Sequence, residues 1–293
     1  MLFRSRCGKL IVATSEEQNA TLEQIRAKAA ANGVDDLEWL APDAVRALEP
    51  EVFCTAALLS PSTGIIDSHS LMLAFQGDAE DRGAMIAFGA PLERARIGED
   101  GIRLFVGGAE PMALEAGIVV NSAGLHAPQI AARLEGLRPE HVPPAHYCKG
   151  NYYMLAGARP FQHLVYPVPE QAGLGIHVTI DLGGQVRFGP DVEWIEALDY
   201  DVDPKRAEVF YDAIRKYYPG LKDGAIEPGY AGIRPKIGPK GAPAADFIVQ
   251  GPREHGVPGL VNLFAIESPG LTAALALAEE VETALAQSLS CAA

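Results

Sequence analysis

The feature that most constrains the fold is the strand–turn–helix pattern near the end of the chain. Residues 260–266 (LVNLFAI) are apolar apart from Asn262 and indicate a buried strand, which is followed by Ser268-Pro269-Gly270 and a long alanine-rich stretch. An uninterrupted apolar run, Ile118-Val119-Val120, leads into a turn and a helix-like stretch from Pro128. Such runs are typical of strands buried on both faces of a parallel sheet, so the pattern predicts an α/β fold.

The start of the closing helix could also carry function. Ser268 can cap the helix with Pro269 at its first position, which would point several backbone N–H groups beyond the carboxyl end of a buried strand. Open α/β sheets bind ligands at that place, and a helix amino terminus favours negative charge. The alternative is a capped helix that only packs against its neighbours.

Short β-type runs separated by turns fill two further regions, 84–121 and 145–195. They include the runs 85–88, 92–97, 102–106, 152–155, 164–168, 175–180 and 186–188, with Gly183-Gly184 as a tight turn. A capping box formed by Ser15 and Gln18 predicts a helix that ends at about Asn32. Asp203-Pro204 predicts the start of another helix, which ends at about Gly220. Two further helices are expected over 42–50 and 68–83.

Composition excludes several function classes. The chain has 293 residues, a formal net charge of −14 and a pI near 4.9, and no basic run, so nucleic acid and anionic membrane surfaces are poor partners. The four cysteines are scattered without a C-x-x-C pair, which indicates reduced thiols rather than a disulfide framework or a metal site. No apolar stretch is long enough to span a membrane and no signal-peptide core is present, so a cytoplasmic protein is expected.

Two polar residues stand in surroundings suited to chemistry. Arg234 precedes a proline in an apolar neighbourhood, where an extended backbone could present its guanidinium to a carboxylate at two points. His177 lies in a strand-like run and could take a proton from a hydroxyl. Alternatively, Arg234 only forms a salt bridge, and His177 is a histidine of the sheet whose hydrogen bonds are made within the protein. Tyr166, Tyr152, Lys149 and His69 are further polar candidates of the same kind.

Several familiar motifs are missing. A G-x-G-x-x-G does not follow an opening strand, and there is no P-loop, H-E-x-x-H or G-x-S-x-G.

The combination of segments nevertheless resembles a known family. The FAD-dependent oxidoreductases of the D-amino-acid oxidase superfamily, and within it the L-2-hydroxyglutarate oxidase/dehydrogenase-like proteins, show a similar collinear series. The segments that carry the resemblance are CGKLIVAT at 7–14, LEP at 48–50, SPSTGIIDSH at 60–69, VVNSAGLHA at 119–127, CKGNYY at 148–153, the run 165–194, YAGIRPKI at 230–237, AADFIVQG at 244–251 and NLFAIESPGLTAALALAE at 262–279.

The resemblance implies two interleaved domains. Residues 1–58 and 145–230 would form an α+β substrate-binding domain, and residues 59–144 and 231–293 the remainder of a Rossmann-like FAD-binding domain. Such proteins begin with a glycine-rich βαβ unit that grips the adenine half of FAD. This chain is expected to lack that unit and, with it, the main site for the adenine half of FAD.

The resemblance also implies roles for individual residues. Arg234 would hold a substrate carboxylate and His177 would accept the hydroxyl proton, with Tyr166, Tyr152, Lys149 and His69 as further substrate-binding candidates. The candidate FAD-binding residues are Leu92, Asn121, Ser122, Ala123, Gly124, Glu267, Ser268, Pro269, Gly270, Leu271 and Thr272.

The implied activity is oxidation of a small 2-hydroxy acid, such as 2-hydroxyglutarate, by hydride transfer to FAD. Two alternatives stay open: oxidation of an amino acid or N-methyl amino acid, and an inactive remnant that does not hold FAD. His177 favours the hydroxy acid, because a hydroxyl benefits from a base. The partners are then a small carboxylate substrate and an electron acceptor, oxygen or a quinone.

Overall fold

The computed structural model describes residues 4–157, 159–168 and 175–289. The chain divides into two compact units, each assembled from separated stretches of sequence. The first unit comprises residues 1–84, 149–193 and 200–232, and the second comprises residues 85–148, 194–199 and 233–293. The mixed α/β class expected from the sequence is confirmed. None of the described helices is long and apolar enough to cross a lipid bilayer.

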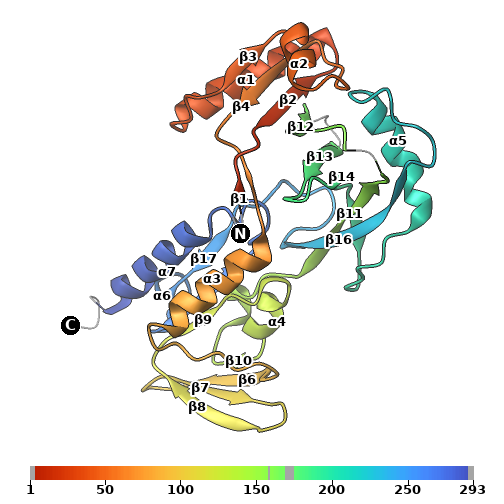
Figure 1. Cartoon of the computed structure of the whole chain (residues 1–293). Coiled ribbons are helices and arrows are strands. Elements are labelled where there is room, and N and C mark those ends of the chain that lie inside the picture. The colour runs from red at the N-terminus through yellow and green to blue at the C-terminus, as the bar shows by residue number, and fades with distance from the viewer. Residues whose placement is uncertain (1–3, 158, 169–174, 290–293) are drawn as a thin grey trace. The chain divides into compact units, whose positions relative to one another are not determined.

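Figure 1 shows the course of the chain. The helices are α1 (Glu16–Ala31), α2 (Pro42–Leu48), α3 (Ser68–Glu80), α4 (Ala127–Ala131), α5 (Ala207–Arg215), α6 (Pro252–His255) and α7 (Ala274–Leu289). The strands are β1 (Arg4–Ser5), β2 (Lys9–Ala13), β3 (Glu38–Leu40), β4 (Ala56–Ser60), β5 (Ile65–Ile66), β6 (Leu92–Ile97), β7 (Ile102–Val106), β8 (Met112–Ala116), β9 (Val119–Asn121), β10 (Leu134–Glu135), β11 (His146–Leu155), β12 (Leu164–Pro167), β13 (His177–Ile180), β14 (Val186–Gly189), β15 (Glu193–Ile195), β16 (Ile226–Lys236), β17 (Ile248–Gln250) and β18 (Leu260–Phe264).

A large sheet dominates the first unit. Its strands run in the order β15-β11-β14-β13-β12-β2-β4-β3, and β16 also pairs with β11. Strand β2 pairs in parallel with β12, far away in sequence. The core between this sheet and α5 contains Phe210 and Ile214 from the helix, and Tyr153, Val178 and Phe188 from the strands. The hairpin expected at Gly183-Gly184 is confirmed, because β13 and β14 pair in antiparallel register on either side of it.

The second unit contains two smaller sheets. Strands β6, β7 and β8 form an antiparallel sheet that β10 extends in parallel, and β17, β18 and β9 form the other, with β18 and β9 parallel. A core cluster that includes Ala127, Leu260 and Phe264 lies between these elements. The run 85–88, which was expected to be a strand, is irregular, and Met85 and Phe88 are largely exposed.

The prediction that 118–120 is buried on both faces is wrong. Strand β9 pairs with β18 along one edge, and Val119 packs against the core of the second unit. Ile118 and Val120 are 54% and 40% exposed, because no other described element covers their side chains.

The cap of one helix and the end of another also differ from the prediction. Helix α1 has the expected extent, but the capping box does not form, because the Gln18 side chain accepts hydrogen bonds from the backbone and hydroxyl of Thr14. Asp203 does cap the next segment by accepting from the Lys205 N–H, and α5 then ends at Arg215 rather than near Gly220.

A buried carboxylate ties the first unit together. Glu49, at the end of α2, is fully buried, and one of its oxygens accepts the backbone N–H groups of Gln162 and His163 at 2.8 and 2.7 Å. The same oxygen lies 2.7 Å from the imidazole Nδ1 of His163. These contacts fix the loop that enters β12, the strand that carries Tyr166.

We predict that Glu49→Ala lowers the free energy of unfolding by about 3 kcal/mol, because it removes a buried carboxylate that three groups of the loop before β12 contact. Glu49→Gln keeps an acceptor for the backbone N–H groups and should cost about half as much. Urea unfolding of both variants measures the difference, with Glu51→Ala as an exposed control. Equal stability of Glu49→Ala and the unmodified protein would contradict the assignment.

Candidate functional site

One face of the large sheet is polar because side chains alternate along each strand. On β13, Val178 and Ile180 enter the core that α5 covers, so His177 and Thr179 lie on the other face. Arg187 of β14 pairs in register with Thr179 and lies on that same face. The sheet therefore has an apolar side and a side with titratable groups.

His177 and Tyr166 form the centre of this polar face. Their rings stack with centroids 3.9 Å apart and planes 22° apart, and the Lys9 Nζ lies 5.2 Å from the centroid of the Tyr166 ring. Burial raises the pKa of Tyr166 and lowers that of Lys9. The phenol therefore stays protonated at neutral pH, which makes the imidazole the better candidate for a base in this pair.

A cavity of about 700 Å³ opens on the same unit. Two of the predicted residues, His69 and Tyr152, line it together with Thr179, Arg187 and Tyr230. The rings of Tyr152 and Tyr230 stack with centroids 4.6 Å apart. The sequence interpretation did not single out Arg187, although its alternation with buried Val186 and Phe188 was a usable signal.

A glycine makes room for this aromatic pair. Gly189 lies opposite His177 in the β13–β14 register and has φ +143°. A Cβ there would stand 2.8 Å from the Tyr152 ring and 2.6 Å from the backbone oxygen of Asn151. Any side chain at this position would displace Tyr152 from the polar face.

Lys149, in contrast, lies on the core side of the sheet. It is 3% exposed, and its ammonium donates to the carbonyl of Asp201. Its neighbours on that side of β11 bond the same downstream segment, with Asn151 donating to Asp191 and Tyr153 to the carbonyl of Asp203. The structure therefore does not bring Lys149 together with Tyr152, Tyr166 or His177.

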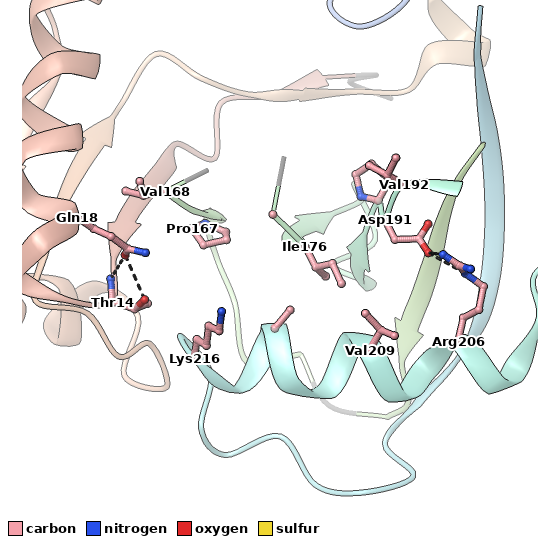
Figure 2. Close-up of a pocket in the computed structure, with 13 residues that line it drawn as sticks. Thr14, Gln18, Pro167, Val168, Ile176, Asp191, Val192, Arg206, Val209 and Lys216 are labelled. Carbon is pink, nitrogen blue, oxygen red and sulfur yellow. Dashed lines mark hydrogen bonds and ion pairs between the residues drawn. The ribbon is translucent and has the colours of Figure 1, made fainter. Parts of the chain in front are cut away.

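A second pocket of about 310 Å³ lies beside α5, on the side of the sheet away from the polar face (Figure 2). Apolar side chains such as Ile176 and Val209 form most of its lining. Its Arg206 guanidinium is paired with Asp191, and Gln18 is bonded to Thr14. None of the substrate-binding residues expected from the sequence lines it.

In the second unit, two exposed turns lie at the edge of the three-stranded sheet where the parallel strands β9 and β18 end. Strands β9 and β18 run in parallel with Asn121 opposite Asn262, so the residues that follow them emerge at the same edge. These are Ser122, Ala123 and Gly124 after β9, and residues 268–272 after β18, most of them exposed. Apart from Gly124 and its neighbours in the chain, none of the described heavy atoms lies within 4 Å of the position a Gly124 Cβ would take.

The predicted cap at Ser268 is wrong. Helix α7 begins at Ala274, and residues 268–273 form consecutive turns. The N–H of Glu267 donates to the carbonyl of Ala265, and the N–H of Gly270 donates to the carbonyl of Glu267. The Gly270 N–H, which was expected to point outward from the start of the helix, is therefore bonded within the turn.

A row of three amide side chains crosses the same sheet. The Asn121 Nδ2 donates to Asn262 at 3.0 Å and to the carbonyl of Ala127 at 2.9 Å, and the Asn262 Nδ2 lies 3.4 Å from the Gln250 Oε1. Gln250 donates to the carbonyl of His141 at 3.2 Å. Asn262 and Gln250 escaped the sequence interpretation, because only the strand register places them beside Asn121.

The remaining candidates also lie in the second unit. Arg234, on β16, donates to the Cys148 sulfur at 3.4 Å. Lys236 forms an ion pair with Glu267, which holds the side chain of that candidate FAD contact. Leu92 begins β6, and its carbonyl accepts from Arg133. Among the described residues, no cluster of His, Cys, Asp and Glu could hold a metal ion.

A comparison with known protein families shows to which family the chain belongs. Residues 2–283 match the FAD dependent oxidoreductase family (DAO). The chain belongs to this family. Its mixed α/β fold is shared by solved structures.

Curated relatives carry one recurring name. The chain is 45% identical to the mitochondrial L-2-hydroxyglutarate dehydrogenase of Arabidopsis thaliana, across 94% of its own length and 65% of that protein. It is 31% identical to the L-2-hydroxyglutarate dehydrogenase of Escherichia coli K12, across 63% of its own length and 43% of that protein. The chain thus spans less than two thirds of the length of either relative.

Solved structures share the fold at lower identity. The FAD-bound L-alpha-glycerophosphate oxidase of Mycoplasma pneumoniae matches with a TM-score of 0.82 at 22% identity, over 96% of this chain and 73% of that one. The L-proline dehydrogenase of P. horikoshii matches with a TM-score of 0.78 at 18% identity, over 95% and 71%.

We predict that Asn262→Leu lowers the free energy of unfolding by about 2 kcal/mol, because it breaks the amide row and leaves buried amide groups without partners. Chemical denaturation measures the change. Asn32→Leu, at the exposed end of α1, is the matched control and should change stability by less than about 0.5 kcal/mol. Equal effects of the two substitutions would contradict the role given to the row.

Proposed function

We propose that this chain oxidises a small 2-hydroxy acid of the L-2-hydroxyglutarate type with FAD as its cofactor. The structural observation that carries the proposal is the His177–Tyr166 pair on the polar sheet face. A histidine there suits a substrate whose hydroxyl must lose a proton, and the names of the curated relatives point to the same substrate class.

The edge at which the parallel strands β9 and β18 end fits the proposed cofactor. Its two exposed turns offer backbone and small side chains at the carboxyl ends of parallel strands, a common position for dinucleotides. Asn121 to Gly124, Glu267 to Thr272 and Leu92 remain the candidate FAD contacts. When bound, FAD supplies the acceptor for the hydride that leaves the substrate α-carbon.

The protein residues handle the carboxylate and the proton. Arg234 is the predicted carboxylate clamp, since a guanidinium binds a carboxylate through two parallel N–H donors. The His177 imidazole accepts the hydroxyl proton as the α C–H bond breaks, which leaves a 2-oxo acid. Tyr166 stacks on the imidazole and limits its rotation, while Tyr152 and His69 line the neighbouring cavity.

The proposal extends to the partners. The substrate is a small carboxylate, and a further acceptor, oxygen or a quinone, takes up the electrons. A cytoplasmic location stays a prediction for this chain, whereas the Arabidopsis relative carries the description mitochondrial.

A titration with FAD followed by an anaerobic substrate addition tests the function. We expect the purified chain to bind FAD and L-2-hydroxyglutarate to bleach the flavin absorbance. Bleaching by amino acids or N-methyl amino acids instead would replace the substrate class. If the protein takes up no FAD at all, the enzymatic proposal fails for this chain.

The His177→Asn variant tests the base. We expect kcat for L-2-hydroxyglutarate to fall by about 10²–10⁴-fold, the usual contribution of a positioned general base, with a much smaller change in KM. Tyr166→Phe keeps the stacked ring and is the matched control, with little loss expected. Comparable rates for His177→Asn and the unmodified enzyme would overturn the assignment.

A further inference from the structure

A dicarboxylate substrate needs a second anion-binding group. Lys149, a candidate from the sequence, is buried on the core side of the large sheet and donates to the carbonyl of Asp201. Lys236 lies in the second unit and is paired with Glu267. Arg187 lies on the polar face and lines the cavity with His69. We propose that Arg187 binds the second carboxylate of a 2-hydroxy diacid and thereby selects diacids over monocarboxylic 2-hydroxy acids, an inference that rests on the proposed function.

The orientation of Arg187 is fixed by its neighbours. Its Nη2 donates to Asp181 at 2.7 Å, and its guanidinium carbon lies 5.8 Å from the centroid of the Tyr230 ring. The side chain of Arg187 is 27% exposed, so the group is held in place without being closed off. A guanidinium has five N–H donors, and one bond to Asp181 leaves the others to reach a ligand.

The acidic groups around the cavity do not neutralise this cation completely. Asp181 also accepts the backbone N–H groups of Gly183 and Gln185, both at 2.9 Å. Burial alone would raise the pKa of Asp181, but these N–H groups and the charge of Arg187 bring it below its ordinary value. Asp67 is engaged in capping α3 through His69 and Ser70.

The strand register sets the distance between the proposed base, His177, and the proposed carboxylate-binding residue, Arg187. His177 pairs with Gly189 and Thr179 pairs with Arg187, so His177 and Arg187 are diagonal neighbours on one face. Such neighbours lie about 7–8 Å apart. Two methylene groups separate the hydroxyl-bearing carbon of a five-carbon diacid from its distal carboxylate, so such a substrate can place its hydroxyl near His177 and its distal carboxylate near Arg187.

The test compares substrates and an unreactive analogue across matched variants. The substrates are 2-hydroxyglutarate and 2-hydroxybutyrate, which lacks the distal carboxylate, and the analogue is glutarate, which lacks the hydroxyl. For Arg187→Met we expect the preference in kcat/KM for 2-hydroxyglutarate over 2-hydroxybutyrate to fall by about ten- to a hundred-fold, and the Kd for glutarate, measured by calorimetry, to rise by a similar factor. Arg187→Lys keeps the charge and should lose less.

Two control variants distinguish binding of the carboxylate by Arg187 from a structural role of Arg187 in the β13–β14 hairpin. Asp181→Asn removes the ion pair but keeps Arg187, so glutarate should bind at least as well as to the unmodified protein. Arg159→Met removes an exposed cation that donates to Gly183 in the same hairpin and should leave the preference unchanged.

The outcomes distinguish the two proposals. An unchanged glutarate Kd in Arg187→Met, or an equal loss in Arg187→Met and Asp181→Asn, would overturn the role of Arg187. Failure of the unmodified protein to oxidise 2-hydroxyglutarate would overturn the proposed function, while the glutarate measurement still decides whether Arg187 binds a carboxylate.

Discussion

The alternation of side chains along the strands of the large sheet is the constraint on which the proposed site depends. Because Val178 and Phe188 must enter the core beneath α5, the residues beside them in sequence are directed to the opposite face. His177 and Arg187 reach that face for this reason. A one-residue slip of either strand would turn its titratable group toward the core and its apolar residues toward the polar face, so the core fixes the register that the chemistry needs.

The core side carries polar groups as well, and their function is different. Asn151 and Arg206 both bond Asp191, which attaches the segment before α5 to the centre of β11. Burial would lower the pKa of Arg206, but the bond to Asp191 and the nearby charge of Glu193 raise it instead. The cation is therefore stable but internally neutralised. Charged groups of this kind specify how the helix segment packs, and they do not offer a binding site for an anion.

Local sequence patterns predicted most of the elements, and contacts between distant segments account for the errors. Short β-type runs on either side of Gly183-Gly184 identified β13 and β14, and Asp203-Pro204 identified the start of the segment leading into α5. The Ser268 cap was wrong because the N–H groups of Glu267 and Gly270 close turns with carbonyls two or three residues back.

The candidate site was harder to predict than the fold. Lys149 and Tyr152 are three residues apart on one strand, yet alternation places them on opposite faces. A sequence motif indicates that both residues are present but not which face each one occupies. Arg187 reads as an ordinary polar strand residue until Asp181 and Tyr230 are seen beside it.

The parallel strands β9 and β18 illustrate how an exposed edge of a sheet can be rigid. Strand β9 has three residues and exposes Val120, so apolar burial alone holds it weakly. Its last residue, Asn121, is nevertheless buried, and its amide group is bonded both to Asn262 on the neighbouring strand and to the carbonyl of Ala127 at the start of α4. Buried amide bonds of this sort are directional, and leaving one unmade is costly. The Asn121 side chain thus ties the turn 122–124 to β18 and to α4, and its Oδ1 also accepts from the Ala123 N–H at 3.4 Å.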